Sequence, residues 1–202
     1  TTGLERDKAL AFAAAFGLQA EFQVHETRHD VINAVMQGQA HIGAGGLLRS
    51  EALNDRVYFA AGYLPATLQV VCHRRVRRPR QVADLAHVDL RIVAGLGYEN
   101  VLEQERAKHP DIDWSSEYGV AVEAMIERVA AREVECTLAD SNTIRVSQRF
   151  FPELRVAFDI GETSEFCWAL PRHARRLHEA YANWFDGFKA SGELERLQER
   201  YF

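Results

Sequence analysis

Apolar and polar residues follow one another along this chain in patterns that predict strands and helices in turn. Residues 5–16 (ERDKALAFAAAF) place Phe12 and Phe16 on one helical face, and Gly17 follows as a stop. Short apolar or alternating runs, which are typical of strands, separate the helical stretches. Alternation of strands and helices indicates an α/β fold, so we expect largely parallel sheets flanked by helices.

The predicted elements have approximate limits that the turn and capping residues set. Strands are expected at residues 21–24, 41–44, 66–73, 90–94, 114–118, 134–139, 154–158 and 164–170. Helices are expected at residues 5–16, 31–37, 100–108, 120–132, 141–149, 174–189 and 193–201. Asp30 suits an N-cap for the helix at 31–37, while Gly45-Gly46 and Gly95–Gly97 suit turns.

Two predicted strands, at 66–73 and 164–170, are long and contain no turn signal. They bracket a middle α/β segment, so the pattern predicts two lobes joined by a two-strand hinge. One lobe would comprise residues 1–70 plus 168–202, and the other residues 71–167. Two crossings of this kind allow lobes to close on a ligand held in a cleft between them.

Composition and charge narrow the class of protein. Apolar residues make up 47% and charged residues 26%, as in soluble globular proteins, and no apolar run is long enough for a membrane span. The net charge of −5 argues against a nucleic-acid partner. The basic run at residues 73–80 (HRRVRRPR) is either a solvated loop or a binding site for an anionic polymer or lipid headgroup.

The start of the chain and the cysteines do not decide the cellular compartment of the protein. Thr1 to Arg6 leads straight into a helical pattern, so we expect that any export leader has been removed. Cys72, Cys136 and Cys167 lie in apolar runs without CxxC spacing, and we interpret them as small buried hydrophobic residues. Whether any of them pair is left open by the sequence.

Several runs resemble a known family, the periplasmic proteins that bind polar amino acids. They are GLERD at 3–7, VMQGQAH at 35–41, VECTLADS at 134–141 and the finish from Gly192 to Phe202. The chain is more closely similar to the amino-terminal domain of membrane-bound lytic transglycosylase F, and the likeness covers nearly the whole chain. It rests on RPR at 78–80, HPDIDW at 109–114, FPELRVAFDI at 151–160 and Trp168.

This resemblance implies a type II periplasmic-binding-protein fold with a sensing function. The ligand would be a small molecule or a muropeptide, and the domain would regulate its own carboxy-terminal, lysozyme-like catalytic domain, which lies beyond Phe202. It also implies the periplasm and outer-membrane association for the full-length protein. For this chain we expect no catalysis, no cofactor and no metal site. The alternatives are an amino-acid receptor of an ABC transporter and a cyclohexadienyl dehydratase-like enzyme.

Asp140 is the first candidate for ligand binding. It closes an apolar strand, which places it at the carboxyl edge of a sheet, where ligands of α/β proteins bind. By resemblance it receives the ammonium group of a ligand, and it is equally placed to cap the helix from Ser141. The Gly95-Leu96-Gly97 turn precedes a helix, so its backbone N–H groups suit an anion such as the ligand carboxylate.

A second group of candidates comes from the other predicted lobe. Gly46 to Glu51 occupies the place of the relatives' Thr-x-x-x-Arg carboxylate clamp, but Arg49 is offset, which fits a peptide with an extended carboxyl end. Aromatic rings near strand ends either stack on a ligand or pack in the core. The full expected set of ligand-binding residues is Asp140, Ser141, Arg49, Gly46, Gly95, Gly97, Tyr98, Tyr63 and Trp168.

Overall fold

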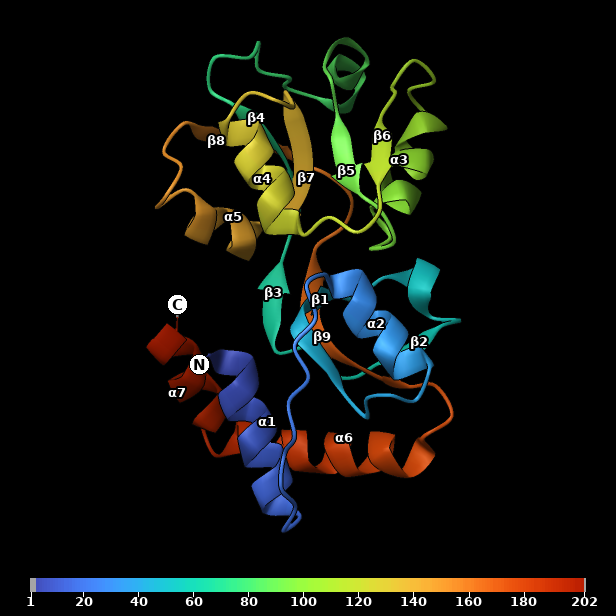
Figure 1. The fold of residues 1–202 in the computed structure, drawn as a ribbon, viewed down its shortest axis with the longest axis vertical. Coiled ribbons are helices and arrows are strands. Elements are labelled where there is room, and N and C mark those ends of the chain that lie inside the picture. Colours follow the sequence, from blue (N-terminus) through green and yellow to red (C-terminus); the bar gives the residue numbers. More distant parts are fainter. Residues whose placement is uncertain (1–2, 202) are drawn as a thin grey trace. The chain divides into compact units, whose positions relative to one another are not determined.

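The computed structural model describes residues 3–201 and divides into two compact units. Unit 1 comprises Thr1–Arg49, Asn54–Leu64 and Phe166–Phe202, and unit 2 comprises Ser50–Leu53 and Pro65–Glu165 (Figure 1). The lobe limits given above stay a prediction beside this division. Across residues 3–201, no helix combines the length and the apolar character that a membrane span requires.

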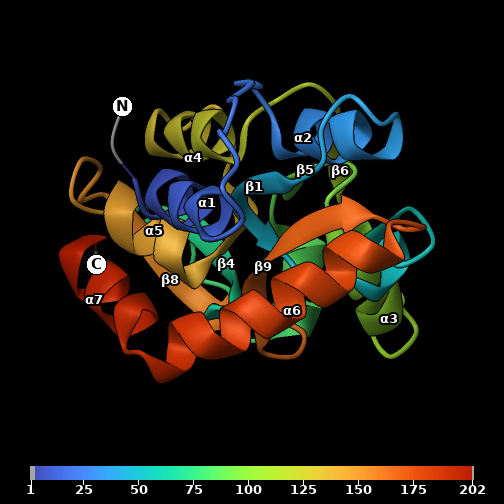
Figure 2. The same ribbon diagram turned by 90° about the horizontal axis from the view of Figure 1, so that it is seen from below.

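Unit 1 is built on an antiparallel sheet. Its strands are β1 (Gly43–Leu48), β2 (Val57–Phe59) and most of β9 (Ser164–Pro171), and the short strand β3 (Leu64–Ala66) begins in unit 1 and ends in unit 2. Its helices are α1 (Leu4–Ala15), α2 (Arg28–Met36), α6 (Arg175–Ala190) and α7 (Glu193–Tyr201). Strand β9 pairs with β1, β2 and β3. Figure 2 shows α6 lying against β9, and the contact is aromatic, since the rings of Trp168 and Tyr181 are 5.1 Å apart. This burial of large rings forms the core of unit 1.

Unit 2 is built on a three-stranded antiparallel sheet and a two-stranded parallel sheet. Its strands are β4 (Leu68–His73), β5 (Arg91–Val93), β6 (Ser115–Glu117), β7 (Cys136–Asp140) and β8 (Leu154–Asp159). Its helices are the 3₁₀ turns Glu51–Leu53 and Val82–His87, with α3 (Tyr98–Arg106), α4 (Val122–Ala130) and α5 (Ser141–Ser147). Strand β4 runs antiparallel to both β7 and β8, whereas β5 and β6 are parallel. A parallel bridge between Leu90 and Cys136 places β5 beside β7.

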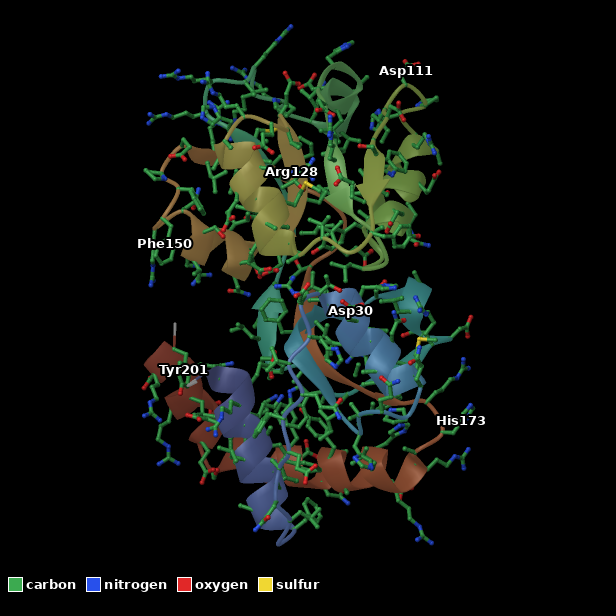
Figure 3. All side chains as sticks on the ribbon, viewed as in Figure 1. Asp30, Asp111, Arg128, Phe150, His173 and Tyr201 are labelled. Carbon is green, nitrogen blue, oxygen red and sulfur yellow. A yellow bond between two sulfur atoms is a disulfide. The ribbon has the colours of Figure 1, made fainter. Side chains whose placement is uncertain are left out.

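Helix α4 shows how the apolar pattern builds the core of unit 2. Its buried residues are Val122, Met125, Ile126 and Val129. Their spacing forms one apolar stripe, which packs on β4, β5 and β7. The polar side of the helix carries Arg128, labelled in Figure 3, which donates a hydrogen bond of 2.7 Å to Glu117 at the end of β6.

The structure resolves the pairing of the cysteines, which the sequence left open. Cys72 on β4 and Cys136 on β7 lie directly opposite each other and form a disulfide, and Cys167 is free and buried. The two bonded residues are 64 positions apart, so only the pairing of the two strands brings them together. All three cysteines are buried, as the sequence predicted, and Cys72 and Cys136 form the pair that the sequence left open.

The expectation of largely parallel sheets is wrong. In unit 1, β9 runs against β1 and β2. In unit 2, β4 enters at the edge where β7 ends, with Leu68 opposite Asp140, and so must run against it. The alternating pattern predicts parallel pairing only for strands joined by a helical crossover, as β5 and β6 are through α3.

Several element limits differ from those predicted. Residues 21–24 form no strand, because no described residue pairs with them, and Val24 is 95% exposed. Helix α2 begins at Arg28 with Thr27 as its cap, rather than at Val31 with Asp30. The run at 66–73 is interrupted at Thr67, which separates β3 from β4. Gly45-Gly46 lies inside β1 as a bulge instead of forming a turn after a strand at 41–44.

Candidate functional site

The carboxyl edge of the parallel strands in unit 2 gathers several candidate residues. Strands β5, β6 and β7 run in one direction, and each is followed by a helix that begins at the same edge, α3, α4 and α5 respectively. The Gly95–Gly97 turn and the Asp140-Ser141 pair therefore lie at one edge of unit 2. Helix N-termini carry partial positive charge, so this edge favours the binding of an anionic group. The Asp140 carboxylate adds a separate negative charge at the same edge.

Asp140 is buried and caps α5. Its Oδ1 accepts hydrogen bonds from the backbone N–H groups of Asn142 (3.1 Å) and Thr143 (2.8 Å). The Thr143 hydroxyl donates to Oδ2 at 2.6 Å. Ser141 is tied to Thr67 on the approach to β4, because its Oγ accepts from the Thr67 N–H at 3.2 Å. These contacts hold the carboxylate rigidly, and its predicted role at a ligand stays a prediction.

The Gly95–Gly97 turn adopts a backbone that favours glycine. Gly95 and Gly97 have φ angles of +79° and +86°, and Gly97 is the N-cap of α3 without a side-chain cap from the described residues. A Cβ atom at Gly97 would clash with Ser50 Oγ. Tyr98 follows and is buried. The Gly95 N–H donates to the Glu99 carboxylate at 3.2 Å, so an internal anion already bonds to the predicted anion site.

The glycines of unit 1 also contact an internal carboxylate. Glu5 Oε1 accepts hydrogen bonds from the N–H groups of Gly45 (3.2 Å) and Gly46 (3.0 Å), and from the Tyr63 hydroxyl. Its Oε2 accepts from the Trp168 ring N–H at 2.7 Å. Gly46, Tyr63 and Trp168, predicted as ligand residues, are thus brought together around Glu5.

Tyr63 and Trp168 are almost fully buried, with exposed fractions of 5% and 0%. Arg49 is tethered to backbone carbonyls of the same unit, since its guanidinium donates to Ala60 at 2.7 Å and Phe59 at 3.4 Å. The ligand role of the three residues stays a prediction. Because the two rings expose almost no surface, their burial argues for core packing rather than for stacking on a ligand.

Lys8 is a charged residue in the aromatic core of unit 1. It is fully buried, and its Nζ lies 3.7 Å from the Tyr63 ring centroid and 4.2 Å from that of Trp168. The rings of Tyr181 and Phe185 are 5.4 and 5.2 Å away. Within residues 3–201 the Nζ atom has no hydrogen-bond partner, so cation–π contacts are its main compensation.

Burial changes the acid–base behaviour of this cluster. Desolvation lowers the pKa of Lys8 from 10.5 to about 7, although the Glu5 carboxylate and then Cys167 act to raise it. Desolvation, and then Glu5, raise the pKa of Tyr63 well above 10.0, so its hydroxyl stays protonated and donates to Glu5. Burial raises the pKa of Tyr181 in the same way.

Sequence reasoning missed Glu5, Lys8 and Glu99 as parts of these clusters. Glu5 stands in the GLERD run that carries the family resemblance, and this was the signal that could have found it. Lys8 stands four residues before Phe12 and so shares its helical face. Glu99 follows the glycine turn in the first turn of α3. Among the described residues, no group of three metal-ligating side chains is placed to hold an ion.

Sheets flanked by helices in both units define a mixed α/β protein of the type II periplasmic-binding-protein class, as the resemblance implied. The whole of residues 1–202 matches the family of bacterial extracellular solute-binding proteins, family 3, and the chain belongs to that family.

Curated relatives share a single description. A "membrane-bound lytic murein transglycosylase F 1" of Alkalilimnicola ehrlichii is 31% identical over 202 residues, covering 99% of this chain and 41% of the relative. A membrane-bound lytic murein transglycosylase F of Maricaulis maris is 32% identical over 201 residues, covering 100% of this chain and 44% of the relative. The chain therefore spans less than half the length of these relatives.

Solved structures share the fold at low sequence identity. An amino acid ABC transporter substrate-binding protein from Streptococcus pneumoniae, bound to L-arginine, has a TM-score of 0.82 and 16% identity over 98% of this chain and 82% of that chain. The ancestral amino-acid-binding protein AncCDT-1, a precursor of cyclohexadienyl dehydratase, has a TM-score of 0.81 and 20% identity, covering 100% and 86%. At such identities the likeness concerns the fold.

Proposed function

We propose that this chain is a periplasmic sensor domain that binds a cell-wall peptide or an amino acid and regulates an attached lytic transglycosylase module. The family assignment makes it a solute-binding domain. The relatives' description supports murein as the source of the ligand, and the share of their length that the chain covers supports an attached module.

The carboxyl edge of unit 2 is the observation that carries the proposal. Asp140 supplies a fixed negative charge, and the N-terminus of α3 supplies backbone N–H groups with partial positive charge, among which the Gly95 N–H is bonded to Glu99. A ligand with an ammonium group and a carboxylate complements this pair of charges. Amino acids and peptides both have that chemistry.

Contacts in unit 1 favour a peptide over a free amino acid. The Gly45 and Gly46 N–H groups bond to Glu5, and the Arg49 guanidinium bonds to the carbonyls of Phe59 and Ala60. A bidentate grip by Arg49 on an α-carboxylate would first have to break these two bonds. These bonds therefore oppose the use of Arg49 as a clamp for the α-carboxylate of a free amino acid.

Calorimetric titration of this chain with murein-derived peptides, free amino acids and murein glycan fragments tests the proposal. We expect saturable binding of peptides with a free amine, and weaker binding of the free amino acids. Tight binding of a free amino acid without any response to peptides would instead favour a transporter receptor. Turnover of prephenate would favour the dehydratase-like enzyme on the same fold.

We also propose that this chain does not itself cleave murein. The family is one of solute-binding proteins, and the relatives extend well beyond the part that this chain covers. Incubation with purified sacculi should release no more soluble anhydro-muropeptides than buffer does, as measured by chromatography. Release above the buffer control would contradict this expectation.

A further inference from the structure

The loop that leaves β4 concentrates positive charge at one end of unit 2. Residues 73–80 (HRRVRRPR), here called the arginine loop, contain five arginines and no acidic residue, in a chain of net charge −5. His73 and Pro79 are buried, whereas every arginine side chain of the loop is exposed. The exposed residues are Arg74, Arg75, Arg77, Arg78 and Arg80.

The backbone of the arginine loop is held in place. The Cys72–Cys136 disulfide joins β4 to β7 at the residue directly before the loop. The Arg74 N–H donates to the Glu153 carbonyl at 2.8 Å, and the Arg80 N–H donates to Asp84 Oδ2 at 2.8 Å. Because the loop is ordered in advance, little backbone entropy is lost when its side chains bind a partner.

Within residues 3–201 the charge of the loop is offset only in part, by the electrostatic interaction of Arg77 with Asp84. None of its arginines forms an ion pair within residues 3–201. Arg132, which is exposed, adds to the same field. Burial is the first cause that lowers the pKa of His73, and Arg132, Arg75 and Arg74 lower it further against the opposing effect of Glu153.

The arginine loop lies at the opposite end of the sheet from Asp140. In the ladder between β4 and β7, Leu68 stands opposite Asp140 and Cys72 opposite Cys136. Four residues of strand, about 14 Å, separate these two positions. Figure 1 shows the loop after β4 and the start of α5 at opposite ends of these strands. The loop is therefore separate from the candidate ligand edge.

We propose that the arginine loop, together with Arg132, docks unit 2 on a bilayer surface rich in anionic phospholipid headgroups. Guanidinium groups bind phosphate oxygens in a bidentate manner, and several at one end of a unit suit a flat array of phosphates. The loop contains no Phe, Tyr or Trp on which bases stack. The negative net charge of the chain also opposes wrapping by a long nucleic acid.

Co-sedimentation of the chain with phosphatidylcholine vesicles, with and without phosphatidylglycerol, tests the proposal. We expect binding only with phosphatidylglycerol, weakening as NaCl is raised. Each basic residue near an anionic surface strengthens binding about fivefold, so R74Q/R75Q/R77Q should weaken it about 100-fold. The matched control R149Q/R175Q/R176Q changes the net charge equally with exposed arginines elsewhere and should bind nearly as well as wild type.

Melting curves of both triple variants establish that they fold like the wild type. If the two triple variants weakened vesicle binding equally, the net charge of the chain would explain the effect, and the proposal would be overturned. Binding to phosphatidylcholine alone, or retention by heparin at a salt concentration where phosphatidylglycerol vesicles do not bind, would also overturn it. The latter result would assign the loop to a soluble polyanion.

Discussion

Lys8 lies on the buried face of α1 because it stands one helical turn before Phe12. The helical pattern thus predicts where the side chain points, while its charge alone predicts exposure. The cation–π contacts that compensate for the burial of the Lys8 charge come from the rings of Tyr63 and Trp168, which lie in distant segments of the chain. No local pattern indicates such a contact, and the same holds for the bonds of Glu5 to Gly45 and Gly46.

The lowered pKa of Lys8 predicts a pH-dependent stability. Between about pH 7 and pH 10.5 the unfolded chain holds a proton on Lys8 that the folded chain lacks, so the free energy of unfolding rises with pH in this window. The slope is at most about 1.4 kcal/mol per pH unit. K8M removes the titrating group, so the variant should be more stable than wild type near neutral pH, by several kcal/mol, and the difference should shrink toward pH 10.

Urea unfolding of wild type and K8M over a pH series measures this difference. Other groups that titrate in the same range are common to both proteins and cancel in the comparison. A stability difference that stays constant with pH would show that Lys8 keeps its ordinary pKa.

At the scale of elements, the apolar pattern predicts β5, β6, β7 and α4 close to their observed limits. Apart from β6, whose predicted range 114–118 (WSSEY) is mostly polar, these elements carry their own signals, a short apolar run or an apolar stripe. Strand direction and pairing depend instead on where the chain enters a sheet, which explains the antiparallel β4 and β9. The sequence left the pairing of the cysteines open for the same reason, because a disulfide depends on which strands are neighbours.

The turn before α3 offers a test of backbone geometry. G97A is expected to destabilise the chain by more than about 1 kcal/mol, because an L-residue is strained at its φ of +86° and the new Cβ would also meet Ser50. G119A is the matched control, with a φ of +71° and nothing within 4 Å of its Cβ. It should lose about 1 kcal/mol from φ strain alone.

Thermal melts of the two variants and of G97A/S50A measure both effects. Removing the Ser50 hydroxyl should recover part of the loss in G97A, since that oxygen is the atom nearest to the new methyl group. Equal losses in G97A and G119A, with no recovery in the double variant, would contradict the close approach of Gly97 to Ser50.

At the scale of the whole molecule, the fold class and the family follow from ordered motifs spread along the chain. The position of the candidate ligand edge of unit 2 was also predictable in part. A carboxylate after one apolar strand and a glycine turn after another mark the carboxyl edge of a parallel sheet. The internal carboxylates Glu5 and Glu99 were not predictable, because side-chain bonds to a backbone loop leave no trace in hydrophobic periodicity.

The central claim is that Asp140 at this edge anchors the positive group of a bound peptide, and D140N tests it most directly. Asparagine keeps the oxygen that caps α5 but removes the charge. A hydrogen bond to a charged group contributes about 1.5–3 kcal/mol, so binding should weaken about 10- to 150-fold. The measurement is calorimetric titration of wild type and D140N with murein peptides, alongside melting curves. We predict a large loss of affinity with a small change in melting temperature, whereas equal affinities would contradict the claim and leave Asp140 a structural cap.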